Sequence, residues 1–358
     1  MKRTFIWLSV LTGTALLLYG GTWFYYSRQE VYRESFSASI VPQAITNEIE
    51  WIPVTWIRDS ISDRSAMFLP IRIDTITKPF FAQFDLGTPV TDFMDITQRF
   101  ACLKKHLCTL DHMLRYQSRP EGLAGITIGI GYGSRTRYVA RHIPIYDRIQ
   151  MDSLEENDTM YTTKVGNIGY DFIDGRILVM DFAHSRIAVT DTLRGELAAR
   201  VRYIGGALVH QFPIYLPITI NGSERLIKYD NGSSAFTLLL PRQQWEGWRQ
   251  AGGRVDTFPG SAWGRPMELL RSNSGVRIAM LGRDRTMLPI WTSTADEPEG
   301  GSFLRSVKAW TDGLFANVYP GWMGNEYFRN DVLVFDARHN RLGVIEPGHA
   351  DSSGHGPP

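Results

Sequence analysis

The sequence FDLGT at residues 84–88 has a counterpart in the second half of the chain, YDNGS at residues 229–233. Both read as an apolar residue, an aspartate, any residue, a glycine and a hydroxyl residue. Each follows two apolar, strand-like runs, which cover residues 68–73 and 80–84 in the first half and residues 212–220 and 226–229 in the second. We therefore predict that a β-hairpin in each half delivers the aspartate to the end of a strand.

The residue types of the two turns suit a pair of carboxylates that meet in space. A glycine two residues after each aspartate permits tight backbone geometry, which turns the carboxylate inward. The hydroxyl that follows can hydrogen-bond the carboxylate and hold its orientation. A single Asp-x-Gly-Ser/Thr is a common surface turn, so one copy alone would carry little weight. The candidate site residues are the aspartates Asp85 and Asp230, the turn glycines Gly87 and Gly232, and the orienting hydroxyls of Thr88 and Ser233.

The surroundings of the two turns also repeat. GYDFI at residues 169–173 aligns without a gap with GNEYF at residues 324–328, and the following strand-like segments keep the same offset of 155 residues (324 − 169). A helix-like stretch begins 11 residues after each aspartate (96 − 85 and 241 − 230), covering residues 96–107 and 241–250. An internal repeat of this kind predicts two copies of one structural unit.

Further motifs carry a resemblance to a known family. WMGNEYF at residues 322–328 runs into VLVFD at residues 332–336, and NIG at residues 167–169 occupies the corresponding place in the first half. Together with the twin turns, these segments resemble the pepsin-like aspartic peptidases of the two-lobed type, over about residues 65 to 346. The resemblance implies an all-β, bilobal fold made from a duplicated lobe. The expected lobes are residues 51–200 and 201–346.

The resemblance also implies a reaction. Asp85 and Asp230, held about 3 Å apart, would share one proton and activate a water molecule that hydrolyses a peptide bond, without a cofactor or a metal ion. ITIGIGYGS at residues 126–134 resembles the flap hairpin that closes over a peptide or protein substrate, which makes Tyr132 the candidate flap residue. An ordinary hairpin with a surface aromatic residue is the alternative interpretation of this segment.

Two residues depart from the family pattern. The family usually has threonine directly after each catalytic aspartate, and the two threonines hydrogen-bond across the junction of the lobes. Here these places hold Leu86 and Asn231. Leucine has no hydrogen-bonding group in its side chain, so an inactive pepsin-fold protein that binds a peptide or protein partner in the cell envelope is the alternative function. A membrane-tethered structural or receptor domain would leave the repeat and both turns to coincidence.

The N-terminus predicts attachment to a membrane. Residues 4–26 carry no charge and form a stretch long enough to span a bilayer, and Lys2 and Arg3 precede it. We predict a signal anchor at residues 1–26 and a juxtamembrane linker at residues 27–50. The short N-terminus would be cytoplasmic and the main body extracytoplasmic. A cleaved signal peptide is the alternative. The polar tail at residues 347–358 is predicted to be disordered.

The remaining composition excludes several classes of function. A net charge of +1 without a basic run argues against nucleic-acid binding, and no histidines stand at metal-binding spacing. On a straight helix, the Cα atoms of Cys102 and Cys108 would lie about 9 Å apart, too far for a disulfide. Either the helix breaks between them or both thiols are free. The family often carries a small disulfide loop in this region, so the resemblance favours the bridge.

Overall fold

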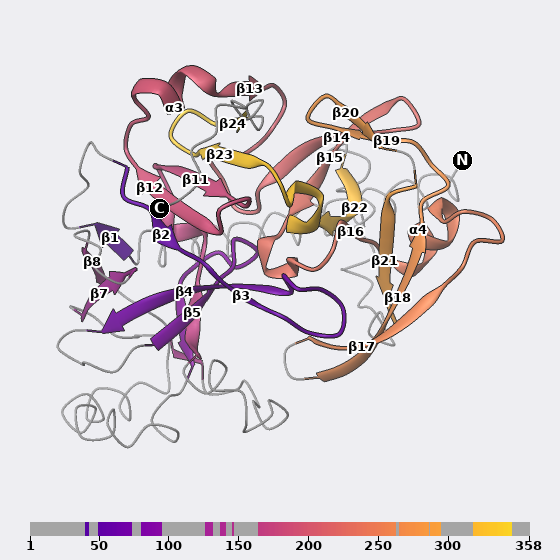
Figure 1. The fold of residues 1–358 in the computed structure, drawn as a ribbon, viewed down its shortest axis with the longest axis horizontal. Helices are drawn as coiled ribbons and strands as arrows, with labels where there is room; N and C mark the ends of the chain where they lie inside the picture. Colours follow the sequence, from indigo (N-terminus) through magenta and orange to yellow (C-terminus); the bar gives the residue numbers. More distant parts are fainter. Residues whose placement is uncertain are drawn as a thin grey trace, which may run out of the picture. The chain divides into compact units, whose positions relative to one another are not determined.

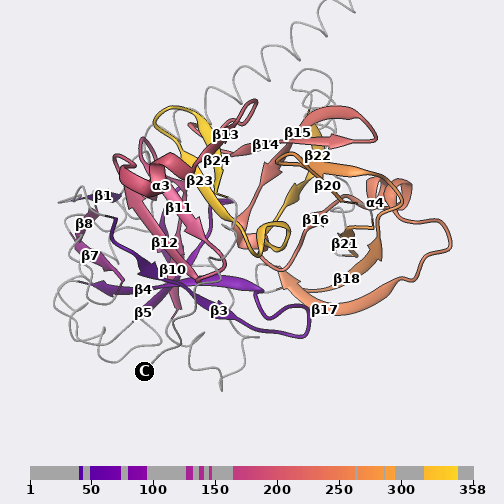
Figure 2. The same cartoon turned by 45° about the horizontal axis from the view of Figure 1, so that its top comes forward.

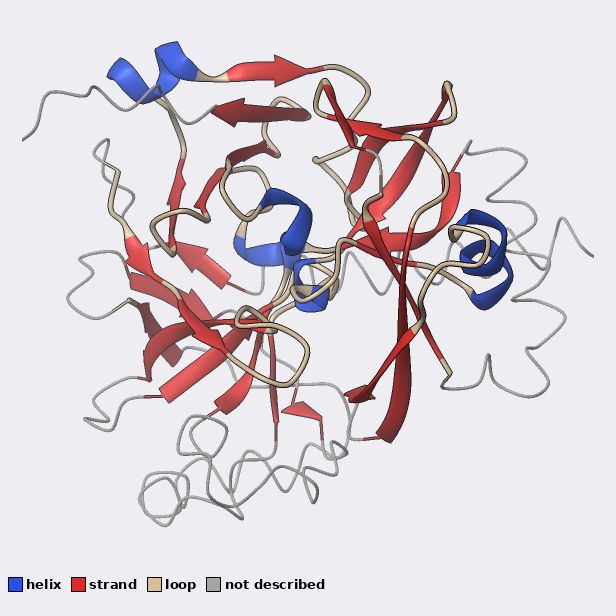
Figure 3. Cartoon of the chain, turned by 45° about the vertical axis from the view of Figure 1, so that its right-hand side comes forward, coloured by secondary structure: helices blue, strands red, loops and turns tan. Residues whose placement is uncertain are grey.

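Strands make up most of the secondary structure in the computed structural model, and the helices are few and short (Figure 1, Figure 3). The described residues all belong to one unit of the chain, Ser39–Pro358. They are residues 40–42, 49–73, 80–94, 126–131, 137–140, 145–146, 164–262, 265–285, 287–294 and 318–345. Over these residues the predicted all-β class is confirmed.

A first nine-stranded sheet contains the strand that leads into the Asp85 turn. Its strands are β1 (Ile40–Pro42), β3 (Thr55–Ile57), β4 (Ala66–Ile73), β5 (Phe80–Phe84), β6 (Asp92–Met94), β7 (Ile126–Ile130), β8 (Arg137–Ala140), β9 (Ile145–Tyr146) and β10 (Lys164–Ile168). Their order is β1-β8-β7-β4-β5-β10-β6-β9, with β3 paired to β4. β4 and β5 form the predicted antiparallel hairpin, with Phe68 opposite Gln83. β1 lies within residues 27–50, so this part of the predicted linker is a strand.

A second nine-stranded sheet contains the strand that leads into the Asp230 turn. Its strands are β14 (Tyr215–Ile220), β15 (Ser223–Tyr229), β16 (Leu238–Leu239), β17 (Asp256–Ala262), β18 (Arg265–Asn273), β19 (Ile278–Met280), β20 (Arg283–Arg285), β21 (Pro289–Ser293) and β22 (Val318–Met323). Their order is β17-β18-β21-β16-β22-β15-β14-β19-β20. β14 and β15 form the second predicted hairpin. The helix α4 (Arg242–Trp248), with Trp245 and Trp248 buried, falls within the predicted helical residues 241–250.

The two sheets have the same strand arrangement around their turns. β10 pairs parallel with β5 and antiparallel with β6, and β22 pairs parallel with β15 and antiparallel with β16. The Asp85 N–H donates to the Ile168 carbonyl, and the Asp230 N–H donates to the Met323 carbonyl, both at 2.9 Å. A short 3-10 helix follows in each half, η2 (Tyr170–Phe172) after β10 and η4 (Asn325–Phe328) after β22. The sequence repeat is therefore a repeat of structure.

A six-stranded sheet joins strands from both halves of the chain. It contains β2 (Ile52–Pro53), β11 (Ile177–Asp181), β12 (Arg186–Thr190), β13 (Arg202–Ile204), β23 (Val332–Asp336) and β24 (Arg341–Ile345), in the order β13-β24-β23-β11-β12-β2. β23 lies beside β11 although far from it in sequence (Figure 2). Val179 faces Val334, its own counterpart in the repeat (334 − 179 = 155). The two copies of the repeat are thus related by a local two-fold axis that passes through this residue pair.

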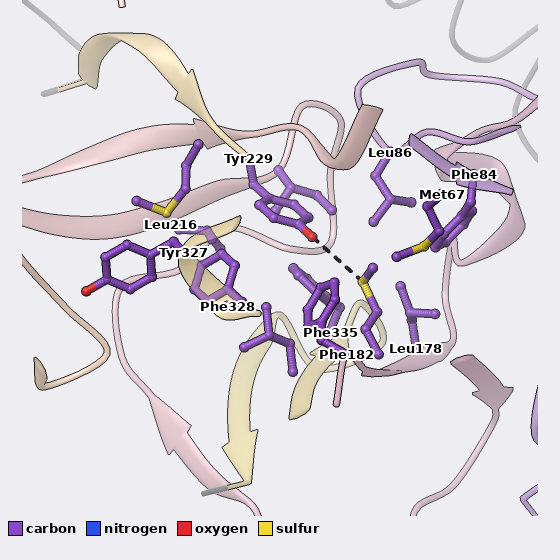
Figure 4. Packing of buried hydrophobic residues seen from close by; sticks show 14 of the residues in the cluster. Met67, Phe84, Leu86, Leu178, Phe182, Leu216, Tyr229, Tyr327, Phe328 and Phe335 are labelled. Atoms are coloured by element: carbon purple, nitrogen blue, oxygen red, sulfur yellow. Dashed lines mark hydrogen bonds between the residues drawn. The ribbon is translucent and has the colours of Figure 1, made fainter. Parts of the chain in front are cut away.

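One apolar core reaches from the first nine-stranded sheet to the second. Phe84 and Leu86 from the first half are fully buried in it, as are Tyr229 and Phe328 from the second half (Figure 4). The outer face of the six-stranded sheet has a smaller cluster of its own, which α3 (Gly195–Arg200) covers with Leu197. Because the main core is continuous across the repeat, burial of apolar area stabilises both aspartate turns together.

Candidate active site

The Asp85 and Asp230 turns face each other where the two halves meet. The Gly87 N–H donates to Asp85 Oδ1 at 2.8 Å, and the Gly232 N–H donates to Asp230 Oδ1 at 3.0 Å. A methyl group on Gly232 would lie 2.5 Å from Asp85 Oδ1, and one on Gly87 would lie 2.5 Å from Asp230 Cγ. Each glycine therefore supports its own aspartate and leaves room for the aspartate of the other half.

The surroundings of Asp85 favour its protonated form. Burial raises the pKa of Asp85 to about 7, and the charge of Asp230 and a hydrogen bond with Asp230 act in the same direction. The Gly87 N–H and the charge of Lys164 oppose this rise in pKa. Two carboxyl groups can hydrogen-bond each other only when one of them is protonated. The raised pKa therefore favours a proton on Asp85 at acidic to neutral pH, in a hydrogen bond with Asp230.

The two predicted orienting hydroxyls behave differently. Ser233 Oγ lies 3.5 Å from Asp230 Oδ2 and donates to it, in the expected direction. Thr88 Oγ1 instead donates to the carbonyl of Val90 at 3.4 Å, which differs from the expectation that it orients Asp85. Short hydroxyl side chains often bond to backbone groups a few residues away, and this local bond competes with the one to the carboxylate.

Asn231 joins the two turns by itself. Its Oδ1 accepts a hydrogen bond from the Leu86 N–H, and its Nδ2 donates to the Phe84 carbonyl at 2.9 Å. Asn231 and Leu86 are both fully buried. The Leu86 side chain packs into the apolar core, to which the Tyr229 ring also belongs (Figure 4). One amide thus makes a donor bond and an acceptor bond across the junction, in place of the reciprocal threonine bonds that the resemblance implies.

Further polar side chains, which were not predicted from the sequence, support the second turn. The Tyr229 hydroxyl donates to Asn325 Oδ1 at 2.6 Å, and Asn325 Nδ2 donates to Ser234 Oγ at 2.8 Å. Ser234 Oγ in turn donates to the Asn231 carbonyl at 2.5 Å. All of these side chains are buried. The chain of bonds links the end of β15, the turn and η4 into one network, which restricts the position of Asp230.

A different set of contacts supports the first turn. The Thr91 N–H and its hydroxyl both donate to Asp171 Oδ1 at 2.8 Å, and the Gly169 N–H donates to Thr91 Oγ1 at 3.1 Å. A methyl group on Gly169 would overlap the backbone at Val90. These contacts attach the segment after Asp85 to η2. A signal for them existed in the sequence, because Gly169 belongs to the repeated motif.

The repeated glycine packs against the second turn in the same way. A methyl group on Gly324 would overlap the carbonyl of Ser233 and would lie 2.6 Å from the carbonyl oxygen of Phe236. The Gly324 N–H donates to the Thr237 carbonyl at 3.3 Å. Both glycines of the repeated motif therefore lie directly against the segment that follows an aspartate, and a larger residue at either place would displace it.

Several predicted features lie outside the described residues. They are Tyr132, Cys102 and Cys108, the helix at residues 96–107, the anchor at residues 4–26 and the tail at residues 347–358. In the part of the chain that the structure describes, no helix has the length and apolar character needed to cross a membrane. Nor do its histidine, cysteine, aspartate and glutamate side chains form a group of three or more that could hold a metal ion. No protein-family model and no curated protein matches the chain.

Proposed function

We propose that the protein is an aspartic endopeptidase with a bilobal, pepsin-like fold. One observation carries the proposal. Two Asp-x-Gly turns, one in each half of the sequence, face each other so closely that each glycine leaves room for the carboxylate of the other half. Two close carboxyl groups that share a proton would supply the chemistry of an aspartic peptidase. The same strand arrangement around both turns supports a duplicated lobe as the scaffold.

In the proposed reaction, the pair starts with one proton and one negative charge. The ionised carboxylate takes a proton from a water molecule between Asp85 and Asp230, and the water oxygen attacks the carbonyl carbon of the peptide. The protonated carboxyl group donates its proton to the carbonyl oxygen. In the second step, one carboxylate takes a proton back from the tetrahedral intermediate and the other carboxyl group protonates the amide nitrogen. The C–N bond breaks, and the pair returns to its singly protonated state.

Rigid placement of the pair supports catalysis, because small displacements of catalytic groups cost large rate factors. Asn231 holds the two turns together, and the network around Asn325 holds the second turn. The leucine at position 86, which has no hydrogen-bonding side chain, favours a second candidate. This candidate is an inactive protein of the same fold that binds a peptide or protein partner in the cell envelope. Asn231 offsets this departure, since it supplies both hydrogen bonds across the junction.

The proposed substrate is a peptide or protein outside the cytoplasm. Residues 4–26 would anchor the enzyme as a single-pass membrane protein with its N-terminus in the cytoplasm. The extended substrate would lie across the pair, with the hairpin that carries Tyr132 over it, because extended peptides bind by adding a strand to an exposed edge. Neither a metal ion nor another cofactor takes part in the proposed steps.

The test uses the full-length protein in detergent, incubated with a peptide library between about pH 3 and pH 8. Wild type is compared with Asp85→Asn and Asp230→Asn. We expect cleavage by the wild type and none by either variant, since one carboxyl group cannot complete the proton transfers. Binding of a statine-type transition-state analogue is measured in parallel. If the wild type neither cleaves peptides nor binds the analogue at any pH, the proposed peptidase activity is refuted. Peptide binding without cleavage would instead identify the inactive binding protein.

A further inference from the structure

Lys164 lies beside the first aspartate turn and takes no part in the proposed proton transfers. It begins β10, the strand that pairs in parallel with β5. Its Nζ donates to Gln83 Oε1 at 2.7 Å and lies 5.6 Å from the centre of the Phe68 ring. Along β5 the core side chains alternate with side chains on the opposite face, and Gln83 belongs to that opposite face. The ammonium group therefore lies on the side of β5 that faces away from the core, close to where the strand delivers Asp85.

The charged groups that act on Lys164 come from two neighbouring elements. Burial lowers the pKa of Lys164 to about 8, and the charges of Asp85, after β5, and Asp92, on β6, oppose this fall. Burial raises the pKa of Asp92 to about 6, while a hydrogen bond from Asn167 and the charge of Lys164 lower it and Asp171 raises it. Asn167 Nδ2 donates to Asp92 Oδ1 at 2.8 Å. Lys164 thus stays cationic over the acidic to neutral range in which Asp85 and Asp92 titrate.

The second half has no charged residue at the three positions that correspond to Lys164, Asn167 and Asp92. Tyr319 stands where the repeat places Lys164 (319 − 164 = 155), and Trp322 stands where it places Asn167 (322 − 167 = 155). The counterpart of Asp92, counted from the aspartate of each turn, is Thr237 (237 − 92 = 145). The lysine on the strand beside β5 and its carboxylate partner Asp92 are therefore features of the first half, whereas the lysine of the second half, Lys228, lies on β15 itself at the place of Gln83 (228 − 83 = 145).

We propose that Lys164 is a positioning residue of the Asp85–Asp230 pair, whose fixed positive charge favours the singly ionised pair over the fully protonated one. This inference rests on the proposed function, because only the singly ionised pair can both accept and donate a proton. A cation near a carboxylate favours its ionised form, and the partial burial of Lys164 weakens the screening of its charge by solvent. The cation also favours loss of the second proton. Lys164 therefore moves the whole active range of the pair toward lower pH.

The test is the pH profile of peptide cleavage by the full-length protein in detergent. Lys164→Met should move both limbs of the profile to higher pH by about one unit, the low end of the range for an opposite charge near a carboxylate. Lys164→Arg keeps the charge and should hold the profile near that of the wild type. Arg225→Met is the matched control, because Arg225 lies 4.9 Å from the ring of Tyr319, the counterpart of Lys164. It removes one cation from the other half and should leave the profile in place.

A second measurement does not depend on activity. Melting temperatures are recorded from about pH 4 to pH 9 for the wild type, Lys164→Met, Asp85→Asn and the double variant. We expect the effect of Lys164→Met on the melting temperature to change with pH, and to change less when Asp85 is already replaced. If the wild type cleaves no peptide, the proposed function fails and this cycle still decides the coupling. Unmoved limbs in an active Lys164→Met, or equal pH dependence in both backgrounds, would overturn the inference.

Discussion

The two aspartate turns have the same backbone and different surroundings. Each turn follows a hairpin, receives a hydrogen bond from its own glycine and rests against a glycine of the repeated motif. The charge of the half-buried Lys164 acts on Asp85, and Lys164 also interacts with a second carboxyl group, Asp92. Around Asp230 they include a network of neutral groups, in which Asn325 is the central residue. The backbone is therefore duplicated, and the set of polar side chains around each aspartate is not.

This difference suits the chemistry that we propose. An aspartic pair must hold one proton and one negative charge at the same time, so its two carboxyl groups perform unlike tasks. Two identical subunits would place both aspartates in the same environment. A single chain with two copies of the unit can place a cation near one aspartate and neutral hydrogen-bonding groups near the other. Variants in either half test this difference, and the largest effect is expected for the charge of the pair.

The charge of the pair should dominate the pH dependence of stability. The folded-state pKa of Asp85 is about 7, against an ordinary value of 3.8. A carboxyl group whose pKa is raised by folding stabilises the folded protein. This contribution is complete at a pH below the pKa of the unfolded state, and it is lost as the pH rises through the pKa of the folded state. The wild type should lose on the order of 4 kcal/mol between about pH 4 and pH 8, at 1.36 kcal/mol per unit. Asp85→Asn should retain much of this stability and be inactive.

Urea unfolding at several pH values measures this effect. The matched control is Asp191→Asn, because Asp191 is an exposed aspartate away from the pair. Its stability should follow the wild-type curve. Some decline between about pH 4 and pH 6 should persist in Asp85→Asn, since burial also raises the pKa of Asp92 to about 6. If the unfolding free energy changed with pH equally in the wild type and Asp85→Asn, Asp85 would not be protonated in the folded protein.

The turn glycines should show the next largest effect, and an equal one in both halves. Gly87→Ala and Gly232→Ala each place a methyl group against the aspartate of the other half. We expect a loss of about 3 kcal/mol of unfolding free energy, the upper end for overpacking, together with loss of cleavage. The control is Gly247→Ala in α4, where nothing lies within 4 Å of the added methyl group. That variant should gain up to about 1 kcal/mol. Tolerance of alanine in one turn only would break the symmetry of the backbones.

The symmetric part of the site could be predicted from the sequence because its determinants are local. Alternating apolar residues and a following Asp-x-Gly turn describe a hairpin that ends in an aspartate, and β4, β5, β14 and β15 form those hairpins. The repeat, with its constant offset, adds long-range information, because two copies of a unit must bury the same faces. The pairing of Val179 with Val334 is the structural form of that repeat. Helix α4 was also predicted, with ends differing by one or two residues.

The asymmetric part could not be predicted, because it depends on how strands far apart in the sequence pair. Lys164 and Asn325 both lie far along the chain from the aspartate turns that they support. Each reaches its turn through the register of β10 on β5 or of β22 on β15, which apolar alternation does not determine. The double role of Asn231 was hidden for a similar reason. Its partners, Leu86 and Phe84, belong to the other half of the chain.

Asn231 should be the residue at which the asymmetry affects stability most. Asn231→Leu keeps the volume and leaves the Leu86 N–H and the Phe84 carbonyl buried without their partner. We expect a loss of about 2 kcal/mol of unfolding free energy, within the range for unsatisfied buried groups, and slower cleavage. Leu86→Met, at the corresponding place in the first turn, conserves volume and should cost less than about 1 kcal/mol. Equal losses in the two variants would mean that Asn231 does not hold the junction.

The smallest effect is expected where the two halves are most alike, at the hairpins of the six-stranded sheet. Asp181 accepts hydrogen bonds from His184 and Arg186, and Asp336, its counterpart in the repeat, accepts the same set from His339 and Arg341. Both carboxylates are buried, while the histidine partners are largely exposed and the arginine partners are partly exposed.

Asp181→Asn and Asp336→Asn should therefore each cost about 1 kcal/mol, because an amide still accepts one of these bonds but loses the ionic contribution. Chemical unfolding of both variants at about pH 7 measures the losses, and cleavage should be unaffected because neither residue contacts the pair. Losses that agree within the error of the measurement would mean that the halves diverged only around the aspartate turns. A large loss in one variant alone would place a second asymmetry at the two-fold axis, where β11 and β23 meet.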